Sequence, residues 1–456
     1  MKSVAFHNLG CKVNSYEIEV MQQYFQKNGY SIVDFAQKAD IYVINTCTVT
    51  NIADRKSRQM IHRAKSLNPG ALIVAVGCYV QTHEQEVLKD DSIDLAVGNN
   101  KKGEIVELVE AFLREQKDKT LGGRSIADLE KEVPYEEMQL DSTAEHTRVY
   151  LKIQDGCNQF CSYCAIPLAR GRVRSRKPEQ ILREAQRMAE KGYREIVITG
   201  IHISSYGMDF DGVSYNSAIR GENYHHSRHL LGLLQSLSQI EGLERIRLSS
   251  LEPRIITPEF AERLSGIPGI CPHFHLSLQS GSDSVLKRMN RQYTTDDFRQ
   301  SVALLRQFFD RPAITTDIIA GFPGETEEEF KQTLSFAESI GFYEMHVFPF
   351  SRRKGTAADR MPGQLTEKEK KERCRRLLEL DQRLCEAYRR QFAGTRMEVL
   401  WECEKQLEGE RWLCGHTTNY IEVALANPAP DEVGSITGCV LSDRQSEGIV
   451  IGDRRA

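Results

Sequence analysis

Hydrophobic and polar positions follow two different periods in the first third of the chain. Short apolar runs, typical of buried strands, alternate with segments in which apolar residues recur every three or four positions, as on one face of a helix. This alternation of strand and helix predicts a parallel, doubly wound α/β sheet, which we assign to an N-terminal domain of residues 1–116. The predicted strands are 3–6, 41–44, 71–76 and 94–97, and the predicted helices are 15–27, 54–67 and 104–114.

The same alternation resumes after residues 117–146, a polar and mostly acidic stretch that we interpret as a linker. Six strand–helix units in residues 147–365 predict a barrel or part-barrel, in which functional residues lie at the C-terminal ends of the strands. The predicted strands are 149–153, 195–199, 245–249, 273–278, 313–319 and 343–349, and helical patterns lie at 179–191, 230–240, 294–308 and 326–340.

A polar insert, residues 208–228, interrupts this central segment. It contains His225 and His226, and His229 follows it directly. Three clustered histidines could bind a metal ion, but an extended surface loop is the preferred interpretation.

The last fifth of the chain changes pattern. Residues 366–394 form a long, charged helical segment that connects to the final domain. Short alternating strands then predict a small all-β barrel over residues 395–456. These predicted strands are 397–403, 411–415, 420–425, 435–442 and 448–451.

Composition narrows the class of protein. With 60 Lys and Arg against 64 Asp and Glu, the net charge is −4, so any nucleic-acid contact must come from a local basic patch. The longest clear apolar run is residues 72–78, and the opening MKSVAFHNLGC lacks the apolar core of a secretory signal. We therefore expect a cytoplasmic protein with no membrane partner, whose twelve cysteines bind metal or are buried rather than forming disulfides.

Cys157, Cys161 and Cys164 form the sequence CNQFCSYC directly after the first strand of the central segment. Thiolates at this spacing in one loop can bind three corners of a [4Fe–4S] cluster and leave the fourth iron open. Zinc would need a fourth ligand, and no Cys or His follows promptly in AIPLARGRVRSR. The spacing is the signature of radical S-adenosylmethionine (SAM) enzymes, and the six units around it resemble their part-barrel.

In that superfamily the open iron binds SAM, and one electron cleaves SAM to methionine and a 5′-deoxyadenosyl radical that attacks unactivated C–H bonds. The resemblance makes Tyr163 a candidate to contact adenine. It also places Gly200 and Gly321 in SAM-contacting loops, although a glycine after a strand is common. Glu252 and Gln279 end strands on the same face, where contact with SAM and a role in a cap or salt bridge are both open.

A second group of cysteines is scattered in the sequence. Cys11, Cys47 and Cys78 each follow one of the first three predicted strands, in VAFHNLGC, IYVINTC and LIVAVGC. Because the C-terminal ends of parallel strands share one edge of the sheet, we expect the three thiols to converge there. Three small buried residues are the alternative, but the repetition favours a second three-cysteine metal site. The other cysteines show no such pattern, and burial is expected for Cys271, Cys374, Cys385, Cys403, Cys414 and Cys439.

A three-cysteine sheet, a radical SAM part-barrel and a small terminal β-barrel together resemble the methylthiotransferase family over nearly the whole chain. Its members insert a methylthio group at an unreactive carbon, and they use SAM both as methyl donor and as radical source. The resemblance implies that Cys11, Cys47 and Cys78 hold an auxiliary [4Fe–4S] cluster that carries the incoming sulfur. It assigns no catalytic residue beyond the cluster ligands.

Three branches of that family act on different substrates: isopentenylated adenosine in tRNA, threonylcarbamoyladenosine at the same place beside the anticodon, and an aspartate of a ribosomal protein. The motifs NLGCKVNSYE, NTCTVTNIADRKSRQ and KIQDGCNQFCSYCAIPLARGRVRSR resemble the threonylcarbamoyladenosine branch most. The resemblance therefore implies methylthiolation of carbon 2 of that base. It also implies a tRNA anticodon loop, a one-electron reductant such as flavodoxin or ferredoxin, and a sulfur source as partners.

The terminal barrel resembles the TRAM module, which binds RNA in relatives, but residues 395–456 carry six Lys and Arg against eleven Asp and Glu. More positive charge lies in helix 366–394 and in an arginine-rich run just after the third cysteine. That run either contacts RNA phosphates or pairs with carboxylates inside the barrel, and both interpretations stay open. Its members are Arg170, Arg172, Arg174, Arg176 and Lys177.

Two non-enzymatic alternatives remain: an iron–sulfur electron carrier and a zinc-stabilised RNA-binding protein. An electron carrier normally closes its cluster with four thiolates, whereas this chain offers three twice. Neither alternative would produce 5′-deoxyadenosine from SAM, which separates both from the enzyme.

Overall fold

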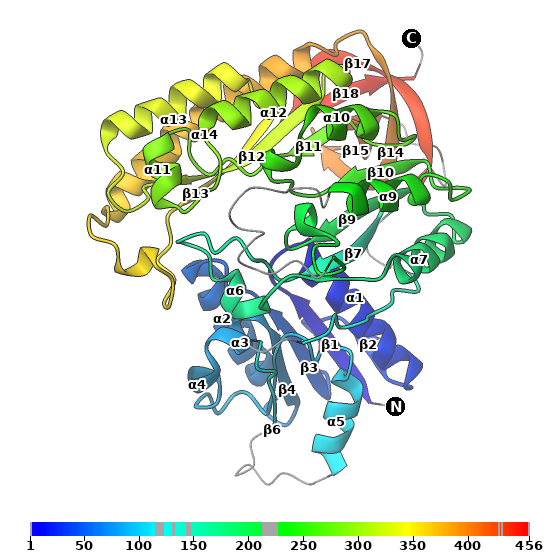
Figure 1. Ribbon diagram of the computed structural model, residues 1–456. Helices are drawn as coiled ribbons and strands as arrows, with labels where there is room; N and C mark the ends of the chain where they lie inside the picture. The colour runs from blue at the N-terminus through cyan, green and yellow to red at the C-terminus, as the bar shows by residue number, and fades with distance from the viewer. Residues whose placement is uncertain are drawn as a thin grey trace.

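The computed structural model describes residues 2–114, 123–129, 133–142, 147–211, 227–426, 429 and 432–454. Figure 1 shows three parts: a sheet domain in blue at the bottom, a larger α/β domain in green and yellow above it, and a β-barrel in red at the upper right. The fold class predicted from the sequence is confirmed. None of the helices in these described ranges is both long and apolar enough to cross a membrane.

The N-terminal domain is a six-stranded, all-parallel sheet in the order β2-β1-β3-β4-β5-β6. All residues of β3 and β4 are buried, as expected for a parallel sheet with both faces covered. The strands are β1 (Ser3–Asn8), β2 (Ser31–Val33), β3 (Ile41–Thr46), β4 (Leu72–Gly77), β5 (Leu95–Val97) and β6 (Gly123–Ser125). The helices are α1 (Lys12–Lys27), α2 (Asn51–Leu67), α3 (Cys78–Thr82), α4 (Glu84–Val87) and α5 (Ile105–Arg114).

Four of these strands match the predicted ones, and the two edge strands were missed. Strands β2 and β6 are only three residues long and only partly buried, so neither leaves an apolar run in the sequence. Strand β6 also lies in the segment predicted as a linker, so that segment adds an edge to the N-terminal sheet.

Six parallel strands build the central domain, and two short bridges, Ile246–Ile270 and Leu251–Leu276, join its two sheets. The sheets have the orders β10-β9-β7-β8 and β11-β12-β13, with the two-residue β8 antiparallel to β7. The strands are β7 (Val149–Asp155), β8 (Arg174–Ser175), β9 (Glu195–Gly200), β10 (Arg245–Leu248), β11 (His273–His275), β12 (Ala313–Ala320) and β13 (Glu344–Pro349).

The four predicted helices of this domain are present, and shorter ones were missed. Helix α10, for example, has Pro258 in its first turn and only a short apolar stripe, and the Phe260 amide donates to the capping hydroxyl of Thr257. The helices are α6 (Ile166–Arg170), α7 (Pro178–Glu190), α9 (Ser227–Leu237), α10 (Pro258–Ser265), α11 (Asp283–Arg288), α12 (Thr295–Phe308) and α13 (Glu327–Ile340), with 3-10 turns η2 (Ile203–Ser205), η3 (Pro253–Ile255) and η4 (Ala358–Arg360).

The histidine-containing insert is only partly described. His225 and His226 lie outside the described residues, whereas His229 lies in the first turn of α9 rather than in a loop. Its Nε2 is 3.0 Å from the Asp211 carboxylate. His229 therefore forms part of a local polar contact at the helix start.

The C-terminal part begins with helix α14 (Glu367–Arg390), whose capping box joins Thr366 and Glu369. Its five strands form a closed barrel in the order β14-β15-β16-β18-β17, which removes free strand edges. These strands are β14 (Arg396–Leu407), β15 (Glu410–Thr417), β16 (Glu422–Ala426), β17 (Ile436–Ser446) and β18 (Ile449–Asp453).

Tyr420 joins this barrel to the central domain. Its ring stacks on His273 with the ring centroids 4.5 Å apart, and the guanidinium groups of Arg148 and Arg247 lie 5.1 and 4.8 Å from it. Arg148 directly precedes β7 and His273 begins β11. The barrel therefore covers the N-terminal end of the central strands, opposite to the end that carries functional residues in such folds.

Trp401 should dominate the stability of the C-terminal barrel. Its side chain is fully buried, and its Nε1–H donates a 2.7 Å hydrogen bond to Thr437 Oγ1. Trp401→Ala should lower the free energy of unfolding of the barrel by about 3–5 kcal/mol because it leaves a large cavity. Trp401→Phe, which loses mainly the hydrogen bond, should cost about 1–2 kcal/mol. Fluorescence of Trp412, the only other tryptophan, reports both transitions in urea. Equal losses in the two variants would show that packing volume is not what Trp401 contributes.

Candidate functional site

The loop after β7 carries Cys157, Cys161 and Cys164, and its backbone allows little variation. Gly156 has φ +70°, and a Cβ atom there would lie 1.8 Å from the Arg172 carbonyl oxygen, so only glycine fits. The Cys157 amide donates a 3.0 Å hydrogen bond to the Gly171 carbonyl. The start of the loop is therefore fixed against the segment that follows the third cysteine.

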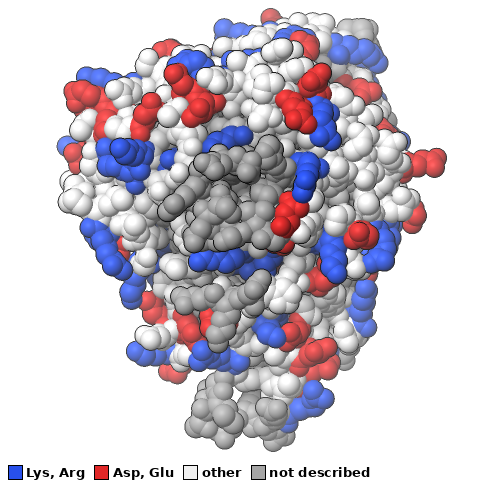
Figure 2. Space-filling view, in the orientation of Figure 1, with Lys and Arg blue, Asp and Glu red and all other residues white. Residues whose placement is uncertain are grey.

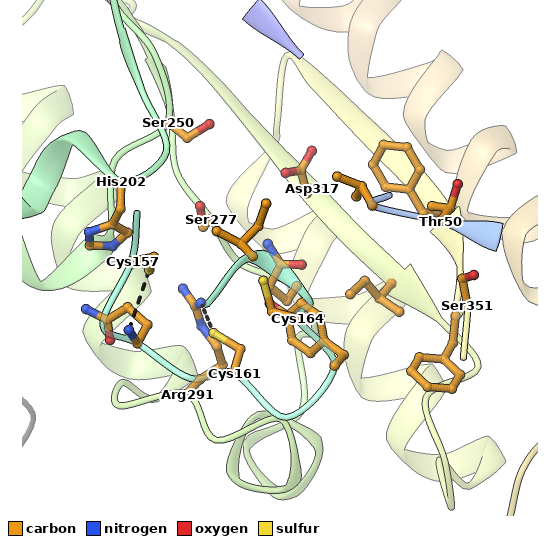
Figure 3. Close-up of a pocket in the computed structure, with 18 of the residues that line it drawn as sticks. Thr50, Cys157, Cys161, Cys164, His202, Ser250, Ser277, Arg291, Asp317 and Ser351 are labelled. Atoms are coloured by element: carbon orange, nitrogen blue, oxygen red, sulfur yellow. Dashed lines mark hydrogen bonds between the residues drawn. The ribbon is translucent and has the colours of Figure 1, made fainter. Parts of the chain in front are cut away.

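The three thiols line a cavity of about 370 Å³ at the C-terminal ends of the central strands. Figure 3 shows the cysteines on one side of this cavity and Thr50 and Ser351 on the other. Thr50 and its neighbour Val49 belong to the N-terminal domain, three and two residues after Cys47. The cavity thus lies where the two domains meet.

The charges around the cysteine loop favour the binding of a metal group by its thiolates. Burial and the neighbouring thiols raise the pKa of Cys157, and burial with the Cys161 charge raises the pKa of Cys164 to about 12. The thiols of Cys157 and Cys164 therefore keep their protons unless a cation is present, and metal coordination removes those protons. Arg291 adds a positive charge, since its guanidinium donates a 3.1 Å hydrogen bond to Cys161 Sγ (Figure 3). These residues fit an iron–sulfur cluster.

Two of the predicted SAM contacts, Tyr163 and Gln279, line the cavity. Gln279 has φ +71°, an uncommon conformation for a residue with a side chain. Its amide donates to the Asp317 carbonyl, and its own carbonyl accepts from the Ile319 amide, both at 2.9 Å. These two bonds form a short parallel bridge between Gln279 and Ile318 of β12. The continuous strand β11 ends at His275, whereas the sequence predicts a strand as far as residue 278.

Glu252 lies beside the cysteine loop. Its carboxylate accepts hydrogen bonds from Gln159 at 3.0 Å and from Arg254 at 2.6 Å, and it lies 3.2 Å from His202 Nε2. His202 and nearby arginines hold the pKa of Glu252 below its usual range despite burial. Because Gln159 lies between Cys157 and Cys161, Glu252 orients the loop.

The two predicted glycines take different positions. Gly200 ends β9, and the next two residues, Ile201 and His202, line the cavity. Gly321 instead lies against α14, where an added Cβ would be 2.6 Å from Lys370 Cγ, and its amide donates to Glu325. The glycine at 321 thus permits close packing of a helix.

The second cysteine group converges as expected from the strand order. Cys11 precedes α1, Cys47 follows β3, and Cys78 opens α3 directly after β4, with β1, β3 and β4 adjacent in the sheet. Burial together with the charges of Cys78 and Cys11 raises the pKa of Cys47 to about 12. Gly10 packs so closely that a Cβ there would lie 3.1 Å from Cys47 Sγ. The three side chains therefore interact as one group.

Burial was expected for the remaining six cysteines. It is confirmed for four of them and wrong for Cys403, which is exposed on β14, while Cys374 on α14 is half-buried. Strand β14 has a register irregularity between Trp401 and Cys403, so the alternation that would predict the inward face does not extend through Cys403. The four buried residues are Cys271, Cys385, Cys414 and Cys439.

A buried ion network connects the two cysteine groups. Glu17 on α1 accepts from Lys152 at 2.7 Å and from Arg170 at 2.8 Å, and it also pairs with Lys102. Asp155, two residues before Cys157, pairs with Lys152 at 2.7 Å and Arg170 at 3.0 Å. All five side chains are almost completely buried. We refer to these five residues as the interdomain ion network.

The arginine-rich run is largely turned inward. Arg170, Arg174 and Arg176 are buried, and Arg176 pairs with Glu184 at 2.7 Å and with Glu137. Arg172 and Lys177 are exposed, with the Arg172 guanidinium 4.4 Å from the Phe160 ring. Internal pairing is therefore the correct interpretation for Arg170 and Arg176.

Several residues at the site belong to no recognisable pattern in the sequence. Arg291 and Asp317 line the cavity but belong to no spaced motif, and Lys102 reaches Glu17 from 85 positions away. Only the tertiary fold brings them together. His202 could have been suspected, since it follows the glycine that ends β9.

Comparison with known proteins agrees with this geometry. Residues 151–337 match the model of the radical SAM superfamily, and residues 3–98 match that of uncharacterized protein family UPF0004. In structure, the chain is similar to the radical SAM methyltransferase TsrM from Kitasatospora setae, with a TM-score of 0.55 and 15% identity over 78% of this chain and 77% of that one. This likeness concerns the fold alone.

Curated relatives cover nearly the whole chain. Threonylcarbamoyladenosine tRNA methylthiotransferase MtaB of Bacillus subtilis (strain 168) is 42% identical over 96% of this chain and 93% of its own. The protein of that name from Aquifex aeolicus (strain VF5) is 40% identical over 92% and 98%. A tRNA-2-methylthio-N(6)-dimethylallyladenosine synthase from Moorella thermoacetica is 34% identical over 90% and 88%.

The thiol-lined cavity at the strand ends and these similarities define a radical SAM enzyme, with a [4Fe–4S] cluster and SAM as cofactors. Within that superfamily, the chain belongs to the methylthiotransferase family that includes the threonylcarbamoyladenosine tRNA methylthiotransferases. The resemblance inferred from the sequence is confirmed.

Glu17→Gln should weaken the docking of the two domains. The substitution leaves Arg170, Lys102 and Lys152 short of one buried carboxylate, which should cost about 3–5 kcal/mol of unfolding free energy. Neighbouring cations hold the pKa of Glu17 well below its usual value, so its contribution is full above about pH 4 and disappears as pH falls through the lowered pKa. Urea unfolding followed by circular dichroism at several pH values measures the difference between wild type and variant.

Glu107→Gln, an exposed position on α5, is the matched control and should change the unfolding free energy by less than about 0.5 kcal/mol. A Glu17→Gln variant as stable as this control at neutral pH would contradict the role given to the network.

Proposed function

We propose that this protein adds a methylthio group to carbon 2 of threonylcarbamoyladenosine beside the anticodon of tRNA. The observation that carries the proposal is the placement of the two three-thiol groups. Val49 and Thr50, two and three residues after Cys47, line the same cavity as Cys157, Cys161 and Cys164. A base in that cavity would lie between a radical source and a sulfur source. Relatives that carry the name of this activity span nearly the whole chain.

The six cysteines form two separate three-thiolate ligand sets, one for each cluster. We assign Cys157, Cys161 and Cys164 to the cluster that binds SAM, and Cys11, Cys47 and Cys78 to an auxiliary [4Fe–4S] cluster. A cluster with three thiolates keeps one iron open, and SAM bound there supplies the radical chemistry that a weakly acidic aromatic C–H bond requires. Arg291 and Arg170, whose charges interact with Cys161 and Cys78 respectively, offset the thiolate charge of the two groups.

The residues that line the cavity separate the predicted SAM contacts into direct and indirect ones. We assign Tyr163 and Gln279 to direct contact with SAM because both line the cavity, and Gly200 to an indirect role through Ile201 and His202, which follow it and also line the cavity. Glu252 positions the cysteine loop through Gln159. Gly321 contributes to the packing of α14 on this domain, through its close contact with Lys370.

The RNA must reach this cavity from an anticodon loop, in which a base can leave its stack at small cost. Figure 2 shows positive and negative side chains interspersed on the face in view, in keeping with the net charge of −4. We assign phosphate contacts to exposed cations near the site such as Arg172 and Lys177, and a TRAM-like supporting role to the barrel. The reductant, the sulfur source and a cytoplasmic location remain predictions.

Deletion of the gene tests the substrate. The nucleoside 2-methylthio-threonylcarbamoyladenosine should disappear from total tRNA, because the C–H bond at this carbon is too weakly acidic for a side-chain base and needs the radical chemistry of this enzyme. Mass spectrometry of tRNA nucleosides from cells with and without the gene measures it, and complementation serves as control. Loss of the isopentenyl product instead would assign the protein to the neighbouring branch.

Cysteine variants test the two clusters separately. Cys161→Ala should abolish release of 5′-deoxyadenosine and remove about half of the iron, since it takes one ligand from the SAM site. Cys47→Ala should keep reductive SAM cleavage but lose methylthiolated product. Iron analysis, SAM cleavage and product formation are measured on anaerobically reconstituted protein, with the buried Cys271→Ala as control. Product at the wild-type rate from Cys47→Ala would refute the auxiliary site.

A further inference from the structure

Two segments from different domains meet beside the cysteine-lined cavity (Figure 1). The Asn51 amide at the start of α2 donates a 3.0 Å hydrogen bond to Ser351 Oγ, and Ser351 lines the cavity. Arg353 donates at 2.6 Å to the Asn51 side chain and pairs at 2.6 Å with the buried Asp54. These contacts hold the two segments together. We refer to them as the entrance rim, which comprises residues 47–60 and 347–360.

Several apolar side chains of the entrance rim are exposed. Val49 and Phe348 belong to the cavity wall, yet 54% and 45% of their surfaces are exposed, so they mark the entrance of the cavity. Ile52, in the first turn of α2, is also about half exposed. The exposed Leu168 of α6 approaches the rim, since a Cβ atom at Gly355 would lie 3.3 Å from its Cδ1. Exposed apolar residues usually occur singly, so this group indicates a binding surface.

The entrance rim is positively charged, although the whole chain has a net charge of −4. It contains seven Lys and Arg and only two Asp. Both Asp are already paired, Asp54 with Arg353 and Asp359 with Arg352 at 3.1 Å. Within the part of the chain that the structure describes, four exposed cations of the rim make no side-chain ion pair or hydrogen bond, and this charge attracts a polyanion. These cations are Arg55, Lys56, Lys354 and Arg360.

Apolar and basic side chains are combined on both sides of the entrance. Ile52, Arg55 and Lys56 are three and four positions apart on α2, so they are neighbours on the exposed face of the helix. Across the entrance, Phe348 and Lys354 are exposed within one short segment. Proteins that bind single-stranded RNA use this combination, because bases stack on apolar and aromatic groups while cations contact the phosphates.

The ring of Phe348 is available for stacking. Among the described residues, no aromatic ring or cation packs on it, whereas the ring of Phe350 packs against Phe322 with centroids 5.4 Å apart. Phe348 is in register with Ile319 of β12, and both residues line the cavity. A base that passes from solvent towards the thiols would therefore meet the exposed part of this ring.

We propose that the entrance rim binds a single-stranded RNA loop, with an unstacked base on Phe348 and the adjoining phosphates on the unpaired cations of both segments. The inference rests on the proposed function, which supplies the RNA loop. A cavity of about 370 Å³ has room for a modified base but not for the loop from which it comes, so the loop must rest on the surface around the entrance. An acidic protein would meet the same cations, but a nucleic acid combines regularly spaced phosphates with bases that stack.

Two sets of variants separate stacking from charge. Phe348→Ala removes the ring, and Phe348→Tyr keeps it. The double variant Lys56→Gln/Lys354→Gln removes two cations, and the double Arg variant keeps them. Leu378→Ala on α14 and Lys331→Gln on α13, both exposed positions outside the rim, are the matched controls. Fluorescence anisotropy with an anticodon stem–loop RNA gives Kd at several salt concentrations on anaerobically reconstituted protein, and iron content with urea unfolding checks the fold.

We expect Phe348→Ala to weaken RNA binding by about 5-fold or more without changing its salt dependence, because the lost contact is a stacked base. The Gln double variant should lower the slope of log K against log salt concentration by about 0.7 for each lost phosphate contact. The Tyr and Arg variants and both controls should bind like wild type. Rim variants with the affinity and salt slope of wild type would overturn the inference.

Wild type alone gives a measurement that needs no variant. It should bind the stem–loop about 5-fold or more tighter than a blunt RNA duplex of the same length, because a paired base does not leave its stack to reach Phe348. Equal affinities, or no binding of the stem–loop, would overturn the inference.

Two other outcomes are distinct. Slower electron transfer from an acidic reductant such as flavodoxin in the rim variants, with RNA binding unchanged, would assign the rim to a protein partner and overturn the inference. If the proposed function fails but the rim binds RNA, the variants still lose affinity for the stem–loop, whereas deletion of the gene leaves 2-methylthio-threonylcarbamoyladenosine in tRNA unchanged.

Discussion

The relative position of two thiol groups from different domains depends on one buried set of charges. Asp155 precedes the Cys157 loop by one residue, Arg170 follows that loop, and Glu17 lies on the helix that Cys11 caps. Three cations and two carboxylates meet there out of water, so each ion is tolerated only while its partners stay in place. The network therefore fixes the docking angle of the domains more strictly than apolar packing alone would.

The interdomain ion network favours metal binding by the thiols in two ways. The network carries one positive charge in excess, and the charge of Arg170 reaches Cys47 and Cys78. Positive potential at the sheet edge favours thiolates, which metal binding needs. Arg170 also donates at 2.7 Å to Asn14, whose amide holds the Leu9 carbonyl beside Cys11. A single side chain thus links the backbone of one thiol group to the loop of the other.

The sequence predicts the parts of the site that repeat or are closely spaced. Cys157, Cys161 and Cys164 form a local motif, and the strand–thiol repetition predicts the convergence of the other triplet because parallel strands end at one edge. Glu17 and Arg170 could not be paired from the sequence, because they are 153 positions apart and meet only after the domains dock. The short edge strands and α10 were missed for a related reason, since neighbours rather than their own apolar pattern stabilise them.

The opposite end of the central strands depends on the same rule for buried charges. The C-terminal barrel closes this end with Tyr420, and charged side chains from β9 and β10, Glu195 and Arg247, face it. Both side chains are buried and paired with each other at 2.7 Å, and Arg247 also donates to the Thr417 and Thr418 carbonyls of the barrel. Removing either partner would leave a buried charge without its counter-ion, which costs free energy. The docking of the N-terminal domain and the closure of the central domain by the barrel thus follow from the same constraint, because each buried charge must find a partner.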